Sequence, residues 1–264
     1  MLKYFKASIV VLIVILVTAG CGADSAKINI VGSTSVQPIA ELLAEKYMQQ
    51  NRNVNINVQG GGSSAGIKAV LDKTADIGAS SRELKPSEEQ KLTTVEIALD
   101  GIAIVNNPQN KVKNLTKEQL KGIFSGTITN WSQVGGENKP IVVVNREEGS
   151  GTRGAFTELV MGETKVSAKA IVQGSTGAVR QTVSGNPDAI GYISLAASDQ
   201  SVQNLKINGE ECTVNNIKQK KYPIVRPFLF ILNGEPSPEI QKFIDYILGD
   251  GQTIIVENGL ISVK

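Results

Sequence analysis

Histidine is absent from this chain of 264 residues. Ser-His-Asp and Cys-His catalysis both need an imidazole as the base, so both classes of enzyme are excluded. A metal site would have only carboxylates and two cysteines as its ligands. We therefore expect no catalytic residue, no bound metal and no cofactor.

The chain also lacks a block of like charge and a large excess of either sign. The formal net charge is +2. Lys3 and Lys6 lie in the leading segment, however, and the chain from residue 21 onward carries 25 basic and 25 acidic side chains. The short basic stretch from Lys218 to Lys221 is typical of a solvated turn. We expect no nucleic-acid partner, and any preference for an anion must come from a local site.

The sequence has no hydrophobic run long enough to span a membrane. The apolar stretch from Ala7 to Val17 falls short of the required length of about 20 residues. Together with the lysines before it, this stretch predicts an export signal over residues 1–20. Small residues before Cys21 resemble a bacterial lipobox, although Thr18 stands where Leu is usual. We expect a lipidated Cys21, a tether over residues 21–26 and a position on the extracytoplasmic face of the cell membrane; an uncleaved anchor and plain secretion are the alternatives.

The rest of the chain alternates strand-like and helix-like segments, the pattern of an α/β fold. Three strands are predicted first, at Lys27–Val31, Asn53–Gln59 and Asp76–Arg82. Each of them ends in Ser or Thr. The carboxyl ends of parallel strands form one edge of a sheet, and ligands bind at that edge. These hydroxyl groups are therefore candidates for a shared site.

The segment from Asn145 to Arg153 has the composition of an anion grip. It lies between a predicted strand, Ile141–Val144, and a predicted helix that begins near Gly154. Two glycines permit a tight turn and a close approach of the backbone to a ligand. Arg146 adds a planar, permanently charged fork that suits an oxyanion. The further donors are Ser150, Gly151 and Thr152. A capped helix after a glycine turn is the plainer interpretation.

Two familiar motifs occur without the residues that they need. The run from Gly62 to Gly66 fits the G-x-S-x-G nucleophile elbow, but no histidine is present to act as the base. The stretch from Gly61 to Gly66 has the Walker glycine spacing, but Ile67 stands where Lys is required. The glycines still expose backbone N–H groups at a helix start, which suits anion binding. An enzyme that uses Ser64 with a lysine base remains an alternative.

A carboxylate near such a site would discriminate between oxyanions. Hydrogen phosphate can donate its proton to a carboxylate, whereas sulfate at neutral pH has no proton to donate and leaves the carboxylate unpaired. Asp100 is the candidate, because it lies on the long extended run Ile97–Asn106 that follows the serine-rich turns. We expect this run to be broken at Asp100-Gly101, and a plain turn before Gly101 is the alternative role of the aspartate.

In five segments, taken in order, the chain resembles the exported phosphate-binding proteins of the phosphate ABC transporter, the PstS family. The resemblance extends over nearly all of the mature length. The five segments are Gly32–Ile39, Gly60–Ile67, Asp76–Arg82, Ile123–Trp131 and Arg146–Arg153. The resemblance implies a two-lobed α/β periplasmic-binding-protein fold of type II, with two crossover strands and phosphate in the cleft between the lobes.

Site residues follow from the resemblance by position. It implies the phosphate ligands Thr34, Ser35, Ser63, Arg146, Ser150, Gly151 and Thr152. The third turn departs from the family pattern, because some members have an aspartate there that accepts the phosphate proton. Here Ser81 occupies that place and stays a candidate ligand, and Asp100 is the predicted proton acceptor.

The long extended runs at residues 97–106 and 222–232 are the candidates for the crossover strands. They predict that residues 27–104 and 225–264 form lobe one and that residues 105–224 form lobe two. We expect a monomeric lipoprotein that captures inorganic phosphate and delivers it to a membrane permease. The alternatives are a receptor for another oxyanion such as sulfate or molybdate, a Ser/Lys hydrolase, and an adhesion or sensory surface protein.

Overall fold

The computed structural model describes residues 25–264. The predicted export signal, the lipidation site Cys21 and most of the tether lie outside the described residues. Within the described part of the chain, each helix is either too short or too polar to cross a membrane.

A mixed sheet runs through the whole molecule in the order β2-β1-β3-β11-β4-β8-β6-β7, and β9 pairs with β4. Its strands are β1 (Ala26–Gly32), β2 (Val54–Gly60), β3 (Ile77–Ser80), β4 (Thr93–Asn106), β6 (Val142–Arg146), β7 (Ile171–Gln173), β8 (Ala189–Ser194), β9 (Gln203–Asn204) and β11 (Val225–Leu232). The strands β1, β2 and β3 are parallel, as are β6, β7 and β8. The long strands β4 and β11 are antiparallel to each other. A separate pair consists of β5 (Asn114–Leu115) and β10 (Lys206–Ile207).

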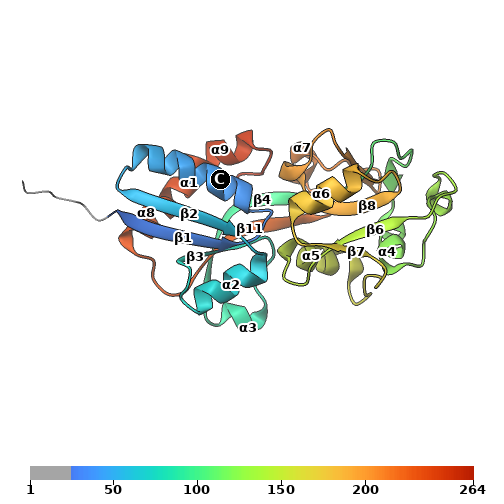
Figure 1. Ribbon diagram of the computed structural model, residues 1–264. Helices are drawn as coiled ribbons and strands as arrows, with labels where there is room; N and C mark the ends of the chain where they lie inside the picture. The colour runs from blue at the N-terminus through green and yellow to red at the C-terminus, as the bar shows by residue number, and fades with distance from the viewer. Residues whose placement is uncertain (1–24) are drawn as a thin grey trace, which may run out of the picture.

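Helices follow most strands and pack onto the sheet, as Figure 1 shows. The α-helices are α1 (Gln37–Gln50), α2 (Ser63–Leu71), α3 (Pro86–Glu89), α4 (Lys117–Ser125), α5 (Gly151–Phe156), α6 (Thr176–Ser184), α7 (Val214–Lys218), α8 (Pro238–Leu248) and α9 (Gly251–Glu257). Short turns of 3-10 helix form η1 (Trp131–Val134) and η3 (Leu195–Ala197). The predicted helix after the grip is α-helical only as far as Phe156, after which η2 (Thr157–Met161) is a π-helical turn.

The buried apolar side chains divide into separate cores, and the crossover strand β4 contributes side chains to both of the large ones. One large core takes its residues from 28–98 and 228–260, with a smaller cluster beside it from the same parts of the chain. The other large core takes its residues from 102–224, with Ile261 added. We call the first part lobe one and the second part lobe two. The fold thus has the two lobes that the sequence predicted, and their exact boundaries stay a prediction.

Strands β4 and β11 connect the lobes and run between them in Figure 1. The predicted break at Asp100-Gly101 is wrong, because β4 continues through both residues. Instead β4 changes partner there: it pairs with β11 as far as Gly101 and with β8 from Ile102 onward. A side chain at Gly101 would lie 2.7 Å from Ile217 Cδ1 and 2.8 Å from Cys212 Sγ, so only glycine fits without a shift of its neighbours.

Local sequence signals account for several helix starts. Thr116 caps α4, because its hydroxyl accepts a hydrogen bond of 3.1 Å from the backbone N–H of Gln119. Helix α1 has Pro38 in its first turn and buries Ile39, Leu43 and Tyr47 on one face. These helices fix the positions of the turns that precede them, and those turns carry the candidate ligands.

Candidate anion-binding site

Hydroxyl groups from both lobes meet at the boundary between them. Lobe one contributes the turn after β1, the start of α2 and the turn after β3. Lobe two contributes the starts of α5 and α6, which lie next to the carboxyl ends of β1 and β3 in Figure 1. The buried polar residues at this boundary include Ser33, Ser35, Ser63, Ser81, Ser150, Thr152 and Thr176. Every hydroxyl in the predicted ligand set belongs to this cluster or borders it.

Arg146 lies at the end of β6 and is 1% exposed. Its Nε and Nη2 donate hydrogen bonds of 2.8 Å to the two carboxylate oxygens of Glu147. Its other contacts reach across to hydroxyls: Nη1 donates to Thr176 Oγ1 at 3.2 Å and Nη2 donates to Thr34 Oγ1 at 3.1 Å. The guanidinium group therefore bonds both to a carboxylate of its own lobe and to the threonine hydroxyls at the boundary.

Ser35 joins the two lobes. Its hydroxyl shares a hydrogen bond of 2.9 Å with Thr152 and one of 2.7 Å with Thr176. On the other side of the site, Ser33 Oγ donates to Ser81 Oγ at 2.8 Å, and the Ser81 backbone N–H donates to Ser63 Oγ at 3.1 Å. Serine and threonine hydroxyls can donate and accept, so bonds of this kind can be exchanged for bonds to an oxyanion.

The grip begins helix α5 as the sequence predicted. Ser150 is its N-cap, and its hydroxyl accepts a hydrogen bond of 3.2 Å from the backbone N–H of Arg153. Gly151 lies so close to lobe one that an added Cβ would be 2.2 Å from Ser63 Oγ. The Ser64 backbone N–H also donates to the Gly149 carbonyl at 3.1 Å. The two glycine-rich turns therefore face each other across the boundary.

Asp100 is fully buried, and Arg226 connects it to the hydroxyl cluster. Its Oδ2 accepts hydrogen bonds from Nε and Nη2 of Arg226, at 3.1 and 2.9 Å, and its Oδ1 accepts one of 2.8 Å from Ser194 Oγ. Burial raises the pKa of Asp100, while Arg226 and Ser194 act to lower it. The expected transfer of a ligand proton to Asp100 stays a prediction.

Comparisons with known proteins place the chain in a family. Residues 17–251 match the model of the PBP superfamily domain. The chain is 31% identical to the phosphate-binding protein PstS of Bacillus subtilis, over 94% of this chain and 90% of the relative. It is 32% identical to the PstS of Borreliella burgdorferi, over 91% of this chain and 92% of the relative. The chain belongs to the PstS family.

Solved structures agree with this membership. A putative phosphate ABC transporter substrate-binding protein from Clostridium perfringens, solved with bound phosphate, is 43% identical with a TM-score of 0.88, over 90% of this chain and 100% of that chain. An ABC-type phosphate transport receptor from Vibrio cholerae is 42% identical with a TM-score of 0.75, over 89% and 99% of the two chains. The predicted fold, a two-lobed periplasmic binding protein of type II, is confirmed.

Several residues at the boundary of this PstS-family protein were not predicted. Arg226 on β11 is 2% exposed and contacts Asp100, Ser81 and Thr152. It is the one charge in the apolar stretch from Tyr222 to Leu232. A charge within a buried strand is a signal that the sequence did offer. Ser33 and Glu147 also contact the predicted ligands. Each stands beside residues of the same or a similar type, Thr34 with Ser35 and Glu148, and no local signal distinguishes it from them.

Ser175, Thr176 and Arg82 lie near the predicted ligands and have different roles. Ser175 is a plain helix cap, because its hydroxyl accepts a hydrogen bond of 3.1 Å from the Ala178 N–H. Thr176 beside it is buried in the hydroxyl cluster. Arg82 pairs with Glu88, Nη1 to Oε2 at 2.8 Å, and so braces the turn after β3 without bonding to Asp100.

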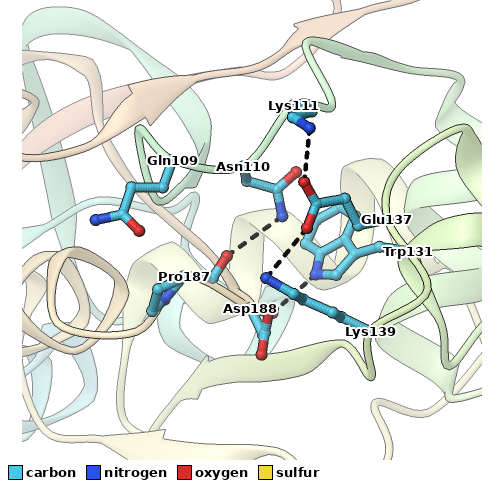
Figure 2. Close-up of a pocket in the computed structure, with 8 residues that line it drawn as sticks. All are labelled: Gln109, Asn110, Lys111, Trp131, Glu137, Lys139, Pro187 and Asp188. Atoms are coloured by element: carbon cyan, nitrogen blue, oxygen red, sulfur yellow. Dashed lines mark hydrogen bonds and ion pairs between the residues drawn. The ribbon is translucent and has the colours of Figure 1, made fainter.

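A pocket in lobe two is shown in Figure 2. Trp131 forms one wall, and its Nε1 donates to the Asp188 carbonyl at 3.0 Å. Glu137 accepts ion pairs from Lys111 at 2.8 Å and Lys139 at 3.1 Å. Glu137 thus pairs with both lysines, and these three side chains together carry a charge of +1. Over residues 25–264, no group of three or more His, Cys, Asp or Glu side chains could hold a metal ion.

Proposed function

We propose that this protein binds one inorganic phosphate ion between its lobes and delivers it to the permease of an ABC transporter. The observation that carries the proposal is the buried cluster of hydroxyl groups from both lobes, held together by Arg146. The 43% identical protein solved with bound phosphate supports the same ligand. The proposed ligands are Thr34, Ser35, Ser63, Ser81, Arg146, Ser150, Gly151 and Thr152, with Asp100 as the candidate acceptor.

Phosphate suits this site because the site offers many short donors from several directions. A tetrahedral anion can replace the bonds that Ser35 makes to Thr152 and Thr176. Arg146 can present a planar pair of N–H groups to two of its oxygens. Because Glu147 already neutralises that guanidinium, the anion is bound mainly by hydrogen-bond donors and only weakly by net charge.

Closure of the lobes supplies both retention and delivery. We propose that residues 27–104 with 225–264 move as one unit against residues 105–224, about the crossover strands β4 and β11. Closure brings Thr152 and Gly149 of lobe two against Ser35 and Ser64 of lobe one. The surfaces of the closed form would then dock onto the permease.

The same proposal includes the location and the assembly. We propose a monomer on the extracytoplasmic face of the cell membrane, held there by lipid at Cys21. Mass spectrometry of the membrane fraction tests the anchor, because an N-terminal peptide that starts at a diacylglyceryl-modified Cys21 would identify it. An unmodified Cys21, or cleavage elsewhere, would refute this part alone and leave phosphate binding intact.

Binding without reaction is a further part of the proposal. The competing hydrolase would use Ser64, whose backbone N–H bonds to Gly149 across the boundary. Incubation with a chromogenic phosphate ester tests it. We expect no turnover above that of Ser64→Ala, and turnover that this substitution abolishes would support the hydrolase instead.

Calorimetric titration is the direct test of the function. The protein from residue 22 to residue 264 is unfolded in denaturant to remove any bound anion, refolded, and titrated with phosphate and separately with sulfate near neutral pH. We expect tight binding of one phosphate and little or no heat from sulfate. Equal binding of both anions would favour a general oxyanion receptor, and silence with phosphate would refute the proposal.

A further inference from the structure

The boundary contains two buried arginines in matching surroundings. Arg146 bonds to the Glu147 carboxylate on one side and to Thr34 and Thr176 on the other. Arg226 bonds to the Asp100 carboxylate on one side and to Thr152 on the other, through Nη1 at 2.7 Å. In each case a carboxylate neutralises and orients the guanidinium, and the guanidinium contacts a threonine hydroxyl of the anion site.

A guanidinium group only donates hydrogen bonds, which determines the role of the hydroxyl it touches. When Arg226 donates to Thr152 Oγ1, that oxygen acts as an acceptor, and its own hydrogen is directed to another partner. Here the available partner is Ser35, at 2.9 Å. The same reasoning applies to Thr34, which accepts bonds from Arg146 Nη2 at 3.1 Å and from the Thr176 N–H at 3.2 Å. Both arginines thus turn threonine hydroxyls into donors toward the centre of the site.

The position of Arg226 is tightly fixed. It lies on β11 directly opposite Asp100 on β4, as paired residues of the two crossover strands. Both side chains are buried, with relative exposures of 1% and 0%. Its guanidinium packs over the Phe228 ring, 5.2 Å from the centroid. Its Nη1 also donates to the Ser81 carbonyl at 3.1 Å, so one nitrogen bonds to lobe one and to lobe two.

We propose that Asp100 is a positioning residue for Arg226, and that Arg226 makes Thr152 a hydrogen-bond donor to the anion when the lobes close. This inference rests on the proposed phosphate binding. It gives Asp100 a different role from that of an acceptor for the phosphate proton. Both carboxylate oxygens already accept hydrogen bonds from Arg226 and Ser194. Oδ2 accepts two of these bonds, both from Arg226, so a proton on the anion could reach only the remaining lone pair of Oδ1, beside Ser194.

A double-mutant cycle on Arg226 and Thr152 tests the coupling, with calorimetric titration of phosphate as the measurement. Arg226→Gln and Thr152→Val should each weaken phosphate binding about 10- to 100-fold, the usual contribution of a hydrogen bond to a charged group. Arg226 acts through Thr152, so the two losses should not multiply. The phosphate affinity of the double variant should lie within about 3-fold of that of whichever single variant has the lower affinity. Losses that multiply, or wild-type binding by Arg226→Gln, would overturn the proposal.

Two further variants exclude a general loss of structure. Thr152→Ser keeps the hydroxyl and should bind within about 5-fold of the wild type, which would not follow if Thr152 only filled space. Arg52→Gln is the matched control, because Arg52 is an exposed arginine in the turn between α1 and β2. Its binding should equal that of the wild type. A wild-type protein that fails to bind phosphate would refute the proposed function, which is a separate outcome.

Asp100→Asn separates the two roles of the aspartate, with sulfate as the second probe. A positioning residue predicts weaker phosphate binding and no gain of sulfate binding relative to phosphate. Sulfate binding that appears or strengthens in Asp100→Asn would overturn the proposal in favour of a proton acceptor. The unpaired Arg226 could prevent this variant from folding, and the double variant Asp100→Asn with Arg226→Gln then replaces it. Its phosphate affinity should match that of Arg226→Gln alone, because Asp100 acts only through Arg226. A further loss in the combined variant would contradict the proposal.

Discussion

Gly151 provides the sharpest test of lobe closure. It lies in lobe two, at the start of α5, and an added Cβ would be 2.2 Å from Ser63 Oγ and 2.7 Å from Ser81 Oγ, both in lobe one. The first distance is more than 1 Å shorter than the optimum of about 3.5 Å for non-bonded heavy atoms. The Ser63 hydroxyl is buried and accepts the Ser81 N–H, so it has little freedom to move away. We expect Gly151→Ala to keep the lobes about 1 Å further apart.

Such a displacement breaks hydrogen bonds that exist only in the closed form. The bond of 3.1 Å between the Ser64 N–H and the Gly149 carbonyl would lengthen beyond bonding range, and so would the bond from the anion to one of the two hydroxyls, Ser35 or Thr152, that face each other across the boundary. At about 1 kcal/mol each, their loss costs about 2 kcal/mol, or about 30-fold in phosphate affinity. The unfolding free energy without ligand should stay the same or rise by up to about 1 kcal/mol, because alanine favours the helix.

The assay combines calorimetric titration of phosphate with urea unfolding of the ligand-free protein. Gly177→Ala is the matched control. Gly177 also lies in the first turn of a helix at the boundary, but a Cβ there would have no atom within 4 Å. It should bind phosphate as the wild type does. Binding by Gly151→Ala within about 3-fold of the wild type would refute closure against Ser63.

Three further predictions concern charge and burial. Arg146→Ala should weaken phosphate binding by about 100-fold or more, because it removes two charge-assisted donors. Calorimetric titration of phosphate measures this loss, and binding within about 10-fold of the wild type would contradict the prediction. Burial raises the pKa of Glu88, but hydrogen bonds from Arg82 and the Lys85 backbone outweigh it and lower the pKa overall. The ionised Glu88 should therefore stabilise the folded protein near neutral pH, and this contribution should be lost as the pH falls through the pKa of Glu88 in the folded state. The unfolding free energies of the wild type and of Glu88→Gln should converge in acid. Burial raises the pKa of the Cys212 thiol to about 12, so a thiol reagent at pH 8 should label it only after denaturation. Rapid labelling of the folded protein would show that the surroundings of Cys212 open to solvent.

Much of the fold followed from local patterns. Alternating apolar residues predicted β1 and β2, because this periodicity depends only on neighbours along the chain. The turn hydroxyls were found in the same way, since strands that run parallel bring their carboxyl ends to one edge. The predicted break at Asp100-Gly101 failed, because packing against β11 and β8 holds this dipeptide extended whatever its turn propensity.

The sequence by itself determined which residue types are available: no imidazole, serine and threonine at the strand ends, and an arginine in a glycine-rich turn. These are local properties, and they were enough to predict an anion site. The two lobes were predicted from the two long extended runs and from the resemblance to the PstS family. Only the tertiary structure decided how the charges are paired. Asp100 and Arg226 are 126 residues apart in sequence, and the pairing of β4 with β11 places them opposite each other. The partner of a buried charge depends on strand register and on the approach of the two lobes, and neither is encoded in the residues next to it.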